Sequence, residues 1–492
     1  MKEFLLITPE IFLALTLAFV IAGEITYYGE QVRLITATAL LGLGGAFIQT
    51  LISYEHGAAQ IFGGALSIDG FSLFFKLFFI VLASFAIATV SHSKEIAEAR
   101  RSEYCALILA STLAMCLIAS VADLALAFLS LLLLNVISHF LAAYGKKSIL
   151  STEAAVKSMA FGAVAAALFL YAAAILFATT HSLNIYEIHK VLLTKPLDPQ
   201  VLLVVFVLLL VSLSYQIGAF PAYMVVPDVL EGAPTPVSAF LSLGPRAAGF
   251  AFMTRVLVAV FTQPASSAGH WEILGQFDWT KMLSVVAGLS MGIGSLLAFR
   301  QNRAKRLVSY LVVAESGFLL IGLLVLDEVG IAALLYSLVI QLFSLVGIFY
   351  VLSFLIDQLQ ADQLDRLRGA MRGAVPECIC LVIFLFCLVG SPPTPGFIAK
   401  FSLIGAAIRH ERSFLAIAGV FSMVVSSAAV ARLVYRLIGD FGDLKEFAVL
   451  GSRRSPARKV LLATLLVPMV LAGVFAEFLF NWAGQSLGFI FW

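Results

Sequence analysis

Three ionisable side chains lie inside or beside long apolar segments and are the first candidates for chemistry. Glu315 lies in the run LVVAESGFLLIG, Lys400 ends the run SPPTPGFIAK, and Arg246 directly follows Pro245. A charge placed inside a bilayer costs at least about 2.5 kcal/mol on insertion scales, so such residues usually mark an ion path or a paired network. Glu315 and Lys400 are therefore candidates for a proton route through the membrane. A guanidinium keeps its proton, so Arg246 is expected to act as a fixed positive charge.

Three further polar residues at membrane depth have simpler interpretations. His139, in NVISHFLAAYGKK, could titrate near neutral pH and give protons access to the interior, or it could be a satisfied structural histidine. Lys76, in DGFSLFFKLFFIV, is interpreted as an anchor whose ammonium reaches the membrane surface. Arg255 is expected near a helix end and receives no functional role.

Prolines interrupt two of the apolar segments. The first interruption contains Pro221, Pro227, Pro234 and Pro236, and the second contains Pro392, Pro393 and Pro395. Proline removes a helix donor and clashes with the preceding turn. In lipid the freed backbone groups cannot reach water, so broken helices persist only where protein or a wet cavity surrounds them. Paired broken helices in two halves of a chain predict an inverted repeat with a transport site at its midplane, although kinks that serve packing alone are the alternative.

The composition places the whole chain in a membrane. Of its 492 residues 61% are hydrophobic and only 12% are charged, whereas soluble domains carry roughly 25% charged residues. A large soluble enzyme is therefore excluded, and a net charge of +2 indicates no nucleic-acid partner. Apolar runs of about 20 residues predict an all-α polytopic protein of about fourteen membrane helices. They are centred near residues 13, 41, 80, 112, 134, 166, 210, 248, 290, 316, 343, 388, 426 and 470.

The loops between these runs indicate orientation and offer no cofactor motif. Most of the 31 Lys and Arg residues fall in alternate loops when both termini are placed outside, as the positive-inside rule requires. Cys378 and Cys380 lie two positions apart, with no second Cys or His pair at zinc spacing. We therefore expect no metal site and no cofactor in this chain.

Four segments together resemble a known family. The runs PDVLEGAPTPVSAFLSLGPRAAGFA, GSPPTPGFIAKFSLIGAAI, DGFSLFFK and EYCALILASTLAMCLIASVADL are similar to the antiporter-like membrane subunits of respiratory NADH-quinone oxidoreductase (complex I). Subunit N, the counterpart of mitochondrial subunit 2, is the nearest of these. The resemblance implies proton translocation coupled to quinone reduction elsewhere in the complex. The whole complex would use NADH and quinone, and this chain would hold no redox centre.

The resemblance also implies an architecture and a location. Within a single transmembrane domain (1–492), three N-terminal helices (1–100) would precede two inverted five-helix repeats (101–262 and 282–440), with helices seven and twelve broken. A cytoplasmic loop and a last helix (441–492) would follow. Other membrane subunits, including sister antiporter-like subunits, and lipid would be the partners, in a bacterial inner membrane with both termini on the outer side.

The chain departs from the family pattern at several charged positions. The usual glutamate of span five is Leu132, the lysine of span seven is Gln216, and a histidine after it is Tyr223. The span-eight lysine becomes Arg246, whereas Lys400 keeps the span-twelve lysine. Glu315 stands where the family often has histidine. The first half has thus lost a carboxylate–lysine pair and the second half has gained one, which predicts proton handling in the C-terminal half.

Three other functions stay open on the sequence alone. The chain could be a proton-inert structural subunit of the same complex, for which Leu132 and Gln216 argue and Lys400 argues against. It could instead be a subunit of a cation/proton antiporter, or of the membrane arm of a hydrogenase, because function resides in the sites that a fold carries and not in the fold itself.

Overall fold

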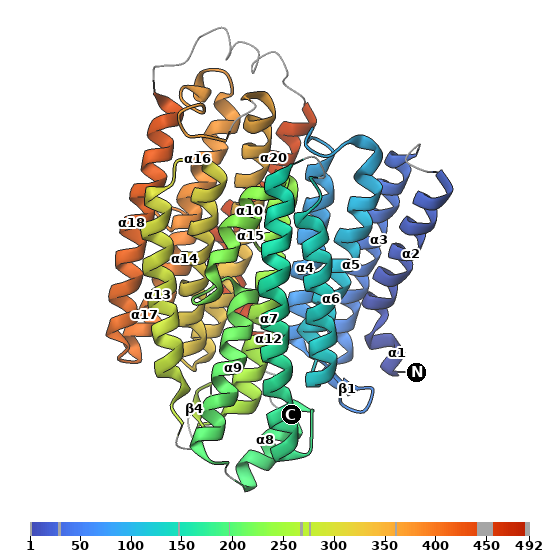
Figure 1. The fold of residues 1–492 in the computed structure, drawn as a ribbon, viewed down its shortest axis with the longest axis vertical. Coiled ribbons are helices and arrows are strands. Elements are labelled where there is room, and N and C mark those ends of the chain that lie inside the picture. The colour runs from blue at the N-terminus through green and yellow to red at the C-terminus, as the bar shows by residue number, and fades with distance from the viewer. Residues whose placement is uncertain are drawn as a thin grey trace.

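Helices make up nearly all of the protein, which is seen here as a computed structural model (Figure 1). The structure describes residues 2–27, 31–145, 148–195, 197–265, 269–274, 277–359, 362–439 and 456–487. Among these residues, 13 helices are long and apolar enough to cross a membrane. The predicted all-α polytopic membrane fold is therefore confirmed.

The long helices follow one another with short connections. In chain order they are α2 (Thr8–Tyr27), α3 (Val32–Ser53), α4 (Gly70–Val90), α5 (Arg101–Ser120), α6 (Leu124–Ala142), α7 (Ile149–Thr180), α9 (Pro199–Ile217) with α10 (Val225–Gly232), α11 (Thr235–Leu241) with α12 (Gly244–Phe261), α13 (Trp279–Arg300), α14 (Ala304–Leu324), α15 (Glu328–Leu359), α18 (Ser413–Ile438) and α20 (Pro456–Val474).

Shorter elements complete the described chain. The helices are α1 (Lys2–Leu6), α8 (Ile185–Thr194), α16 (Val375–Val389), α17 (Pro395–Arg409) and α21 (Ala476–Gln485), with 3-10 turns η1 (Tyr54–His56), η2 (Glu98–Arg100), η3 (Ala222–Met224) and η4 (Ala370–Arg372). Strands β1 (Ala59–Ile61) and β2 (Leu66–Ile68) form one antiparallel hairpin, and β3 (Thr262–Pro264) and β4 (Trp271–Ile273) form another.

The two proline-rich runs separate helices that would otherwise continue. α9 ends at Gly218, whose φ of 67° is a left-handed conformation that glycine adopts without strain, and α10 begins seven residues later. α16 ends in the same way at Gly390, with a φ of 81°. Pro395 then occupies the first turn of α17, where its missing N–H leaves no helix bond unmade.

The prolines take different places in these breaks. Pro221 precedes η3, Pro227 lies in the first turn of α10, and Pro234 and Pro236 start α11. Pro392 and Pro393 lie between α16 and α17. α16 has only 15 residues, so the predicted twelfth span is made by α16 and α17 together.

The centre of the protein is α14. Every residue of this helix except Arg306 is buried, because α10, α13, α15, α17 and α18 all pack around it. α12 is likewise buried at every position except Pro245. An ionisable residue on α12 or α14 therefore lies far from bulk solvent unless a cavity reaches it.

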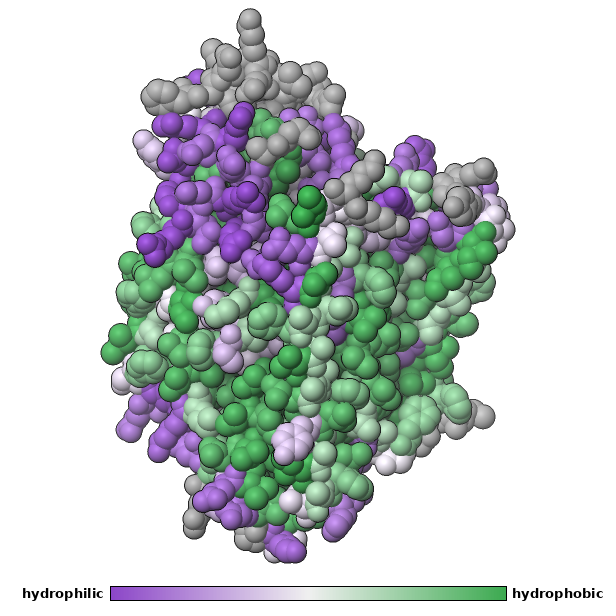
Figure 2. All heavy atoms as spheres, viewed as in Figure 1, coloured by the Kyte–Doolittle hydropathy of each residue, from purple (hydrophilic) through white to green (hydrophobic). Residues whose placement is uncertain are grey.

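Apolar side chains cover the middle of the visible face, while hydrophilic side chains gather at the two ends (Figure 2). Leu41, Phe19 and Phe478 are among many large apolar side chains that are mostly exposed. A band of this kind matches lipid or neighbouring membrane subunits rather than water. Of the cytoplasmic loop and last helix predicted over 441–492, residues 441–455 and 488–492 lie outside the described residues. The boundaries of the two five-helix units stay a prediction.

Candidate functional site

Glu315 and Lys400 meet in the interior as an ion pair. Lys400 Nζ on α17 lies 2.5 Å from Glu315 Oε1 on α14, and each residue is only 3% exposed. The ammonium also donates to the carbonyl oxygen of Val389 at 2.9 Å. Val389 is the last residue of α16, so the helix break supplies the carbonyl that an unbroken helix would have used internally. The proline run thereby provides part of the polar shell that Lys400 needs.

An aromatic ring and a small cavity complete the surroundings of the pair. Lys400 Nζ lies 4.4 Å from the centroid of the Phe318 ring, which favours a cation through its negative face. A cavity of about 10 Å³ touches Glu315, Lys400 and Gln341. That space is about enough for one water molecule. The pair is therefore nearly dry, with one water-sized gap beside it.

Gln341 connects this pair to Arg246. Its Nε2 donates to Glu315 Oε2 at 3.1 Å, and its Oε1 accepts from Arg246 Nη2. Arg246 Nη1 also donates to the carbonyl oxygen of Val312 at 3.0 Å. The four side chains come from α12, α14, α15 and α17 and form one continuous chain of hydrogen bonds. We call Arg246, Gln341, Glu315 and Lys400 the charged array.

The sequence did not point to Gln341. It lies in the apolar run LVIQLFSLVG of α15, where it is only 4% exposed. A lone amide in such a run is the signal that could have found it, because a buried amide must find hydrogen-bond partners.

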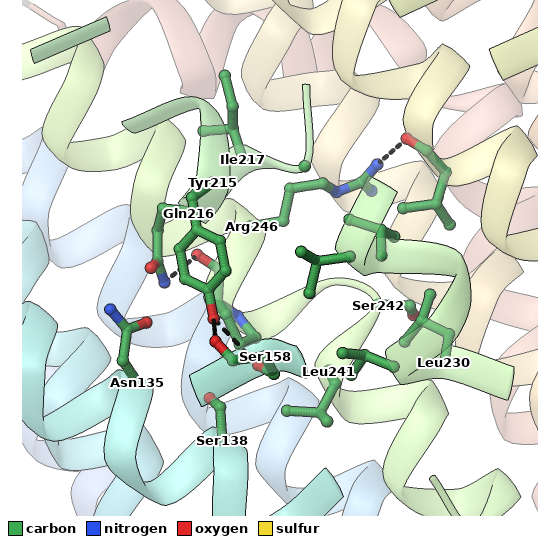
Figure 3. A pocket seen from close by; sticks show the side chains of 16 residues that line it. Asn135, Ser138, Ser158, Tyr215, Gln216, Ile217, Leu230, Leu241, Ser242 and Arg246 are labelled. Carbon is green, nitrogen blue, oxygen red and sulfur yellow. Dashed lines mark hydrogen bonds between the residues drawn. The ribbon is translucent and has the colours of Figure 1, made fainter. Parts of the chain in front are cut away.

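The corresponding region of the first half holds a cavity of about 80 Å³ whose polar lining, apart from Arg246, is uncharged (Figure 3). Gln216 Nε2 donates to the carbonyl oxygen of Pro245 at 3.1 Å. The Tyr215 hydroxyl lies 3.0 Å from the Ser158 hydroxyl and 3.4 Å from His139 Nε2. In Figure 3 Arg246 borders this cavity and directs its guanidinium away from Tyr215, toward the carbonyl on α14.

The other first-half positions do not converge on an ionisable partner. Leu132 is 38% exposed and lines a separate cavity of about 20 Å³ together with Gln216. Tyr223 lies in η3, half-buried, with its ring stacked on Phe220. His139 contacts Tyr215 and does not reach the charged array.

Two other buried ion pairs lie outside the charged array, and the first corrects an expectation from the sequence. Lys76 does not extend to a membrane surface: it is fully buried, and its Nζ lies 2.6 Å from Glu10 Oε1 on α2. Arg255 is also fully buried and binds both carboxylate oxygens of Asp69, at 2.8 and 2.9 Å. A helical pattern cannot reveal a partner that lies 186 residues away.

A larger cavity, of about 860 Å³, opens at the end of the protein where α10 meets the start of α14. Its lining includes Glu231, Arg303 and Asp362. Glu231 forms ion pairs with Arg303 and Arg306 across this junction. Burial raises the pKa of the Asp362 carboxyl above its ordinary value, while the nearby Arg303 and Lys305 act in the opposite direction. An acid of this kind takes up a proton closer to neutral pH than an exposed aspartate does.

Comparison with known proteins places this arrangement in a family. The family model described as "NADH:quinone oxidoreductase/Mrp antiporter, TM" matches residues 121–426. NADH-quinone oxidoreductase subunit N of Chlorobium chlorochromatii (strain CaD3) is 33% identical over 85% of this chain and 82% of its own length. The chain belongs to the subunit N family. A second relative, NADH-quinone oxidoreductase subunit N 2 of Chloroherpeton thalassium, is 34% identical over 85% of this chain and 82% of its own length.

A solved structure agrees with this membership. A chain of respiratory complex I from Thermus thermophilus superposes with a TM-score of 0.72 and 25% identity, covering 95% of this chain and 98% of that one. The chain is thus an antiporter-like, multi-pass membrane subunit of a proton-translocating NADH-quinone oxidoreductase. As a subunit N family member it acts within an oxidoreductase complex, beside other membrane subunits.

Proposed function

We propose that this subunit N chain moves protons through its C-terminal half, by way of Glu315 and Lys400. The observation that carries the proposal is their ion pair, with 2.5 Å between Lys400 Nζ and Glu315 Oε1 on two helices of the buried interior. None of the described residues that line the cavities beside Gln216 is acidic, and the Gln216 amide donates to a backbone carbonyl. Among the residues that line the first-half cavity, Arg246 alone carries a charge, and its guanidinium turns toward the second half.

The pair can hold and release one proton through mutual electrostatics. The Glu315 carboxylate stabilises the ammonium form of Lys400, because an opposite charge within a few ångströms favours the charged state of both partners. A proton that arrives on Glu315 removes this stabilisation and favours release of a proton from Lys400. A water molecule in the gap beside the pair would be the first acceptor of the released proton.

Arg246 biases this exchange without taking part in it. A guanidinium retains its proton, so its positive charge opposes the arrival of another cation and favours the carboxylate form of Glu315. Gln341 holds the two groups at a fixed separation, since it bonds both. Proton uptake would start at the larger cavity, where Asp362 lies among basic residues.

A second function has support from the first half. A proton-inert structural subunit would need no ionisable pair around its first break, which matches Leu132 and Gln216. The two functions differ in what Lys400 does: a structural lysine would matter for folding alone, whereas a conducting lysine would matter for pumping in a folded complex.

The wider setting follows the family. We propose that the two five-helix units are inverted repeats, that sister antiporter-like subunits and lipid cover the exposed apolar band, and that this chain holds no redox centre. NADH and quinone would be used by other subunits of the complex. The chain would lie in a bacterial inner membrane with both termini on the outer side.

Proton pumping by the reconstituted complex tests the proposal. Lys400→Ala and Glu315→Gln should each lower the number of protons moved per electron while the complex still assembles. Lys281→Ala and Glu272→Gln are matched controls, because Lys281 is mostly exposed and Glu272 lies on the exposed side of β4. Normal stoichiometry in both test variants would exclude proton handling by this pair and leave the structural function.

A further inference from the structure

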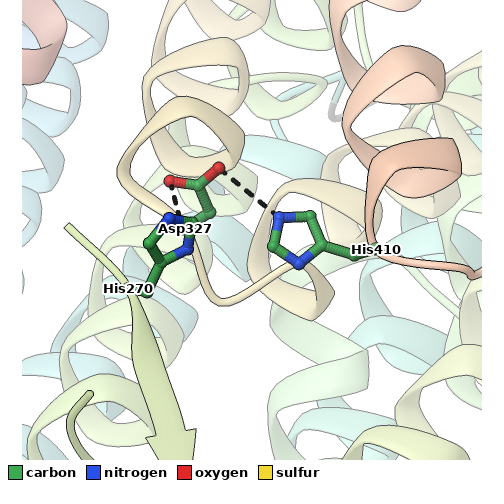
Figure 4. Close-up of side chains that lie close together, drawn as sticks. All are labelled: His270, Asp327 and His410. Atoms are coloured by element: carbon green, nitrogen blue, oxygen red, sulfur yellow. Dashed lines mark ion pairs between the residues drawn. The ribbon is translucent and has the colours of Figure 1, made fainter. Parts of the chain in front are cut away.

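Two histidines and an aspartate converge at the end of the protein opposite the large cavity (Figure 4). His270 lies directly before strand β4, and Asp327 lies between α14 and α15. His410 is the C-terminal cap of α17. His270 Nδ1 lies 3.9 Å from Asp327 Oδ1, and His410 Nε2 lies 3.5 Å from Asp327 Oδ2. Figure 4 shows both rings directed toward the carboxylate. One nitrogen from each ring and the carboxylate oxygen all lie within 4.8 Å of one another.

Backbone hydrogen bonds hold two of the three side chains in register. His270 and Asp327 face each other in an antiparallel bridge. On either side of them, Trp271 N donates to Leu326 O at 3.0 Å, and Glu328 N donates to Gly269 O at 3.0 Å. The carboxylate is oriented further by the backbone N–H of Val329, which donates to Asp327 Oδ1 at 3.2 Å. The convergence therefore belongs to the backbone and not to a chance contact of flexible side chains.

We propose that His270, Asp327 and His410 bind a transition-metal dication, with Zn²⁺ the best match. Two imidazole nitrogens and one carboxylate oxygen form a donor set that Zn²⁺ prefers, and a water molecule would fill the fourth position. Zn–N and Zn–O bonds of about 2.0–2.2 Å bring tetrahedral ligands to about 3.4 Å from one another. The 3.5 Å from His410 Nε2 to Asp327 Oδ2 already has this spacing. The 3.9 Å from His270 Nδ1 runs to the other oxygen, Oδ1, so the carboxylate would bind the ion through both oxygens or the His270 ring would turn toward Oδ2.

The accessibility of the three side chains suits capture of an ion from solution. The two histidine side chains are 42% and 29% exposed, while the Asp327 side chain is only 12% exposed. The partly buried carboxylate thus supplies the negative charge, and the more exposed rings close over the ion. The residues lie 57 and 83 positions apart in sequence, 270 to 327 to 410, so no local metal motif announces them.

A bound ion would join the β3–β4 hairpin to the start of α15 and the end of α17, two helices that carry residues of the charged array. α15 carries Gln341 and begins one residue after Asp327, while α17 carries Lys400 and ends one residue before His410. The ion would fasten the ends of both helices to the β3–β4 hairpin. This site is separate from the proposed proton route, and its test does not rely on pumping.

Zn²⁺ binding to the full-length chain in detergent tests the site. After chelator treatment, equilibrium dialysis with elemental analysis should find one Zn²⁺ per chain. His410→Ala and His270→Ala should weaken binding by more than the roughly 10- to 100-fold that loss of an outer hydrogen-bond partner costs at a zinc site. His56→Ala is the matched control, because His56 is exposed in η1 and outside the cluster; it should bind as the parent protein does.

A second variant and a second probe guard against misfolding. Asp327→Asn keeps a side-chain oxygen that can accept from Val329 N, as asparagine is a good helix cap, yet it removes the anionic ligand. It should fold and bind Zn²⁺ more weakly. Co²⁺ added in place of Zn²⁺ should give the visible absorption of a four-coordinate centre in the parent protein and not in Asp327→Asn. Equal Zn²⁺ affinity in the parent protein and all three cluster variants, or an equal loss in His56→Ala, would overturn the proposal.

Discussion

Replacing Gln341 by leucine removes the link between Arg246 and the Glu315–Lys400 pair while nearly keeping the side-chain volume. Two hydrogen bonds are lost, one to a guanidinium and one to a carboxylate. A hydrogen bond to a charged group contributes about 1.5–3 kcal/mol, so Gln341→Leu should lower the free energy of unfolding by about 3–6 kcal/mol. The groups left behind are buried, and the space for a replacing water is limited to the small gap beside the pair and the cavity that Arg246 borders.

The measurement is denaturant unfolding of the full chain in detergent, together with proton stoichiometry in the reconstituted complex. Ser344→Ala is the control, because Ser344 is buried one turn away on α15, its hydroxyl donates to Ile340 O of the same helix, and it lies outside the lining of the gap beside the pair. Its effect should stay small. Pumping should fall in Gln341→Leu and not in Ser344→Ala, since only the first change separates Arg246 from Glu315. Unfolding free energies within about 0.5 kcal/mol of each other and equal pumping would refute this reasoning.

Three further changes test other contacts. A Cβ at Gly396 would meet Cys387 O at 1.7 Å, so Gly396→Ala should destabilise the chain by at least about 1–3 kcal/mol. A Cβ at Gly405, on the same helix, would meet nothing within 4 Å, so Gly405→Ala should not destabilise it. Equal melting temperatures of the two variants would contradict this expectation. Arg255→Lys keeps the charge but loses the two-atom contact with its carboxylate partner, and a melting temperature as high as that of the parent protein would show that the contact does not matter. Lys76→Met and Glu10→Gln should each lower the unfolding free energy by about 3–5 kcal/mol, and the double variant should lose much less than the sum of both; additive losses would rule out their coupling.

The sequence predicts the helices well because each one must be apolar along a span, whether its side chains face lipid or other helices. Every predicted span centre falls in a described helix, and the breaks occur where glycine ends one helix and proline starts the next. These features depend on neighbouring residues alone. They can therefore be recognised without knowledge of how the helices pack.

Side-chain pairing is a different problem, because it depends on which helices touch. Glu315 and Lys400 could be expected to approach each other only through the resemblance and its implied repeat. The prediction that Lys76 is a surface anchor is wrong, because its partner Glu10 lies on α2, and the local sequence pattern does not show that α2 packs beside α4. Gln341 carries no charge, so the sequence does not distinguish it from other buried amides, although it contacts both Arg246 and Glu315.

The charged array has a consequence for stoichiometry. It contains two basic groups and one acidic group, so one net positive charge remains when all three are ionised. The guanidinium does not give up its proton. Only the carboxylate can therefore accept a proton, and only the ammonium can release one. In the proposed exchange, each cycle of this array would deliver a single H⁺, and a larger count for the complete enzyme would come from repeated cycles or from its other subunits.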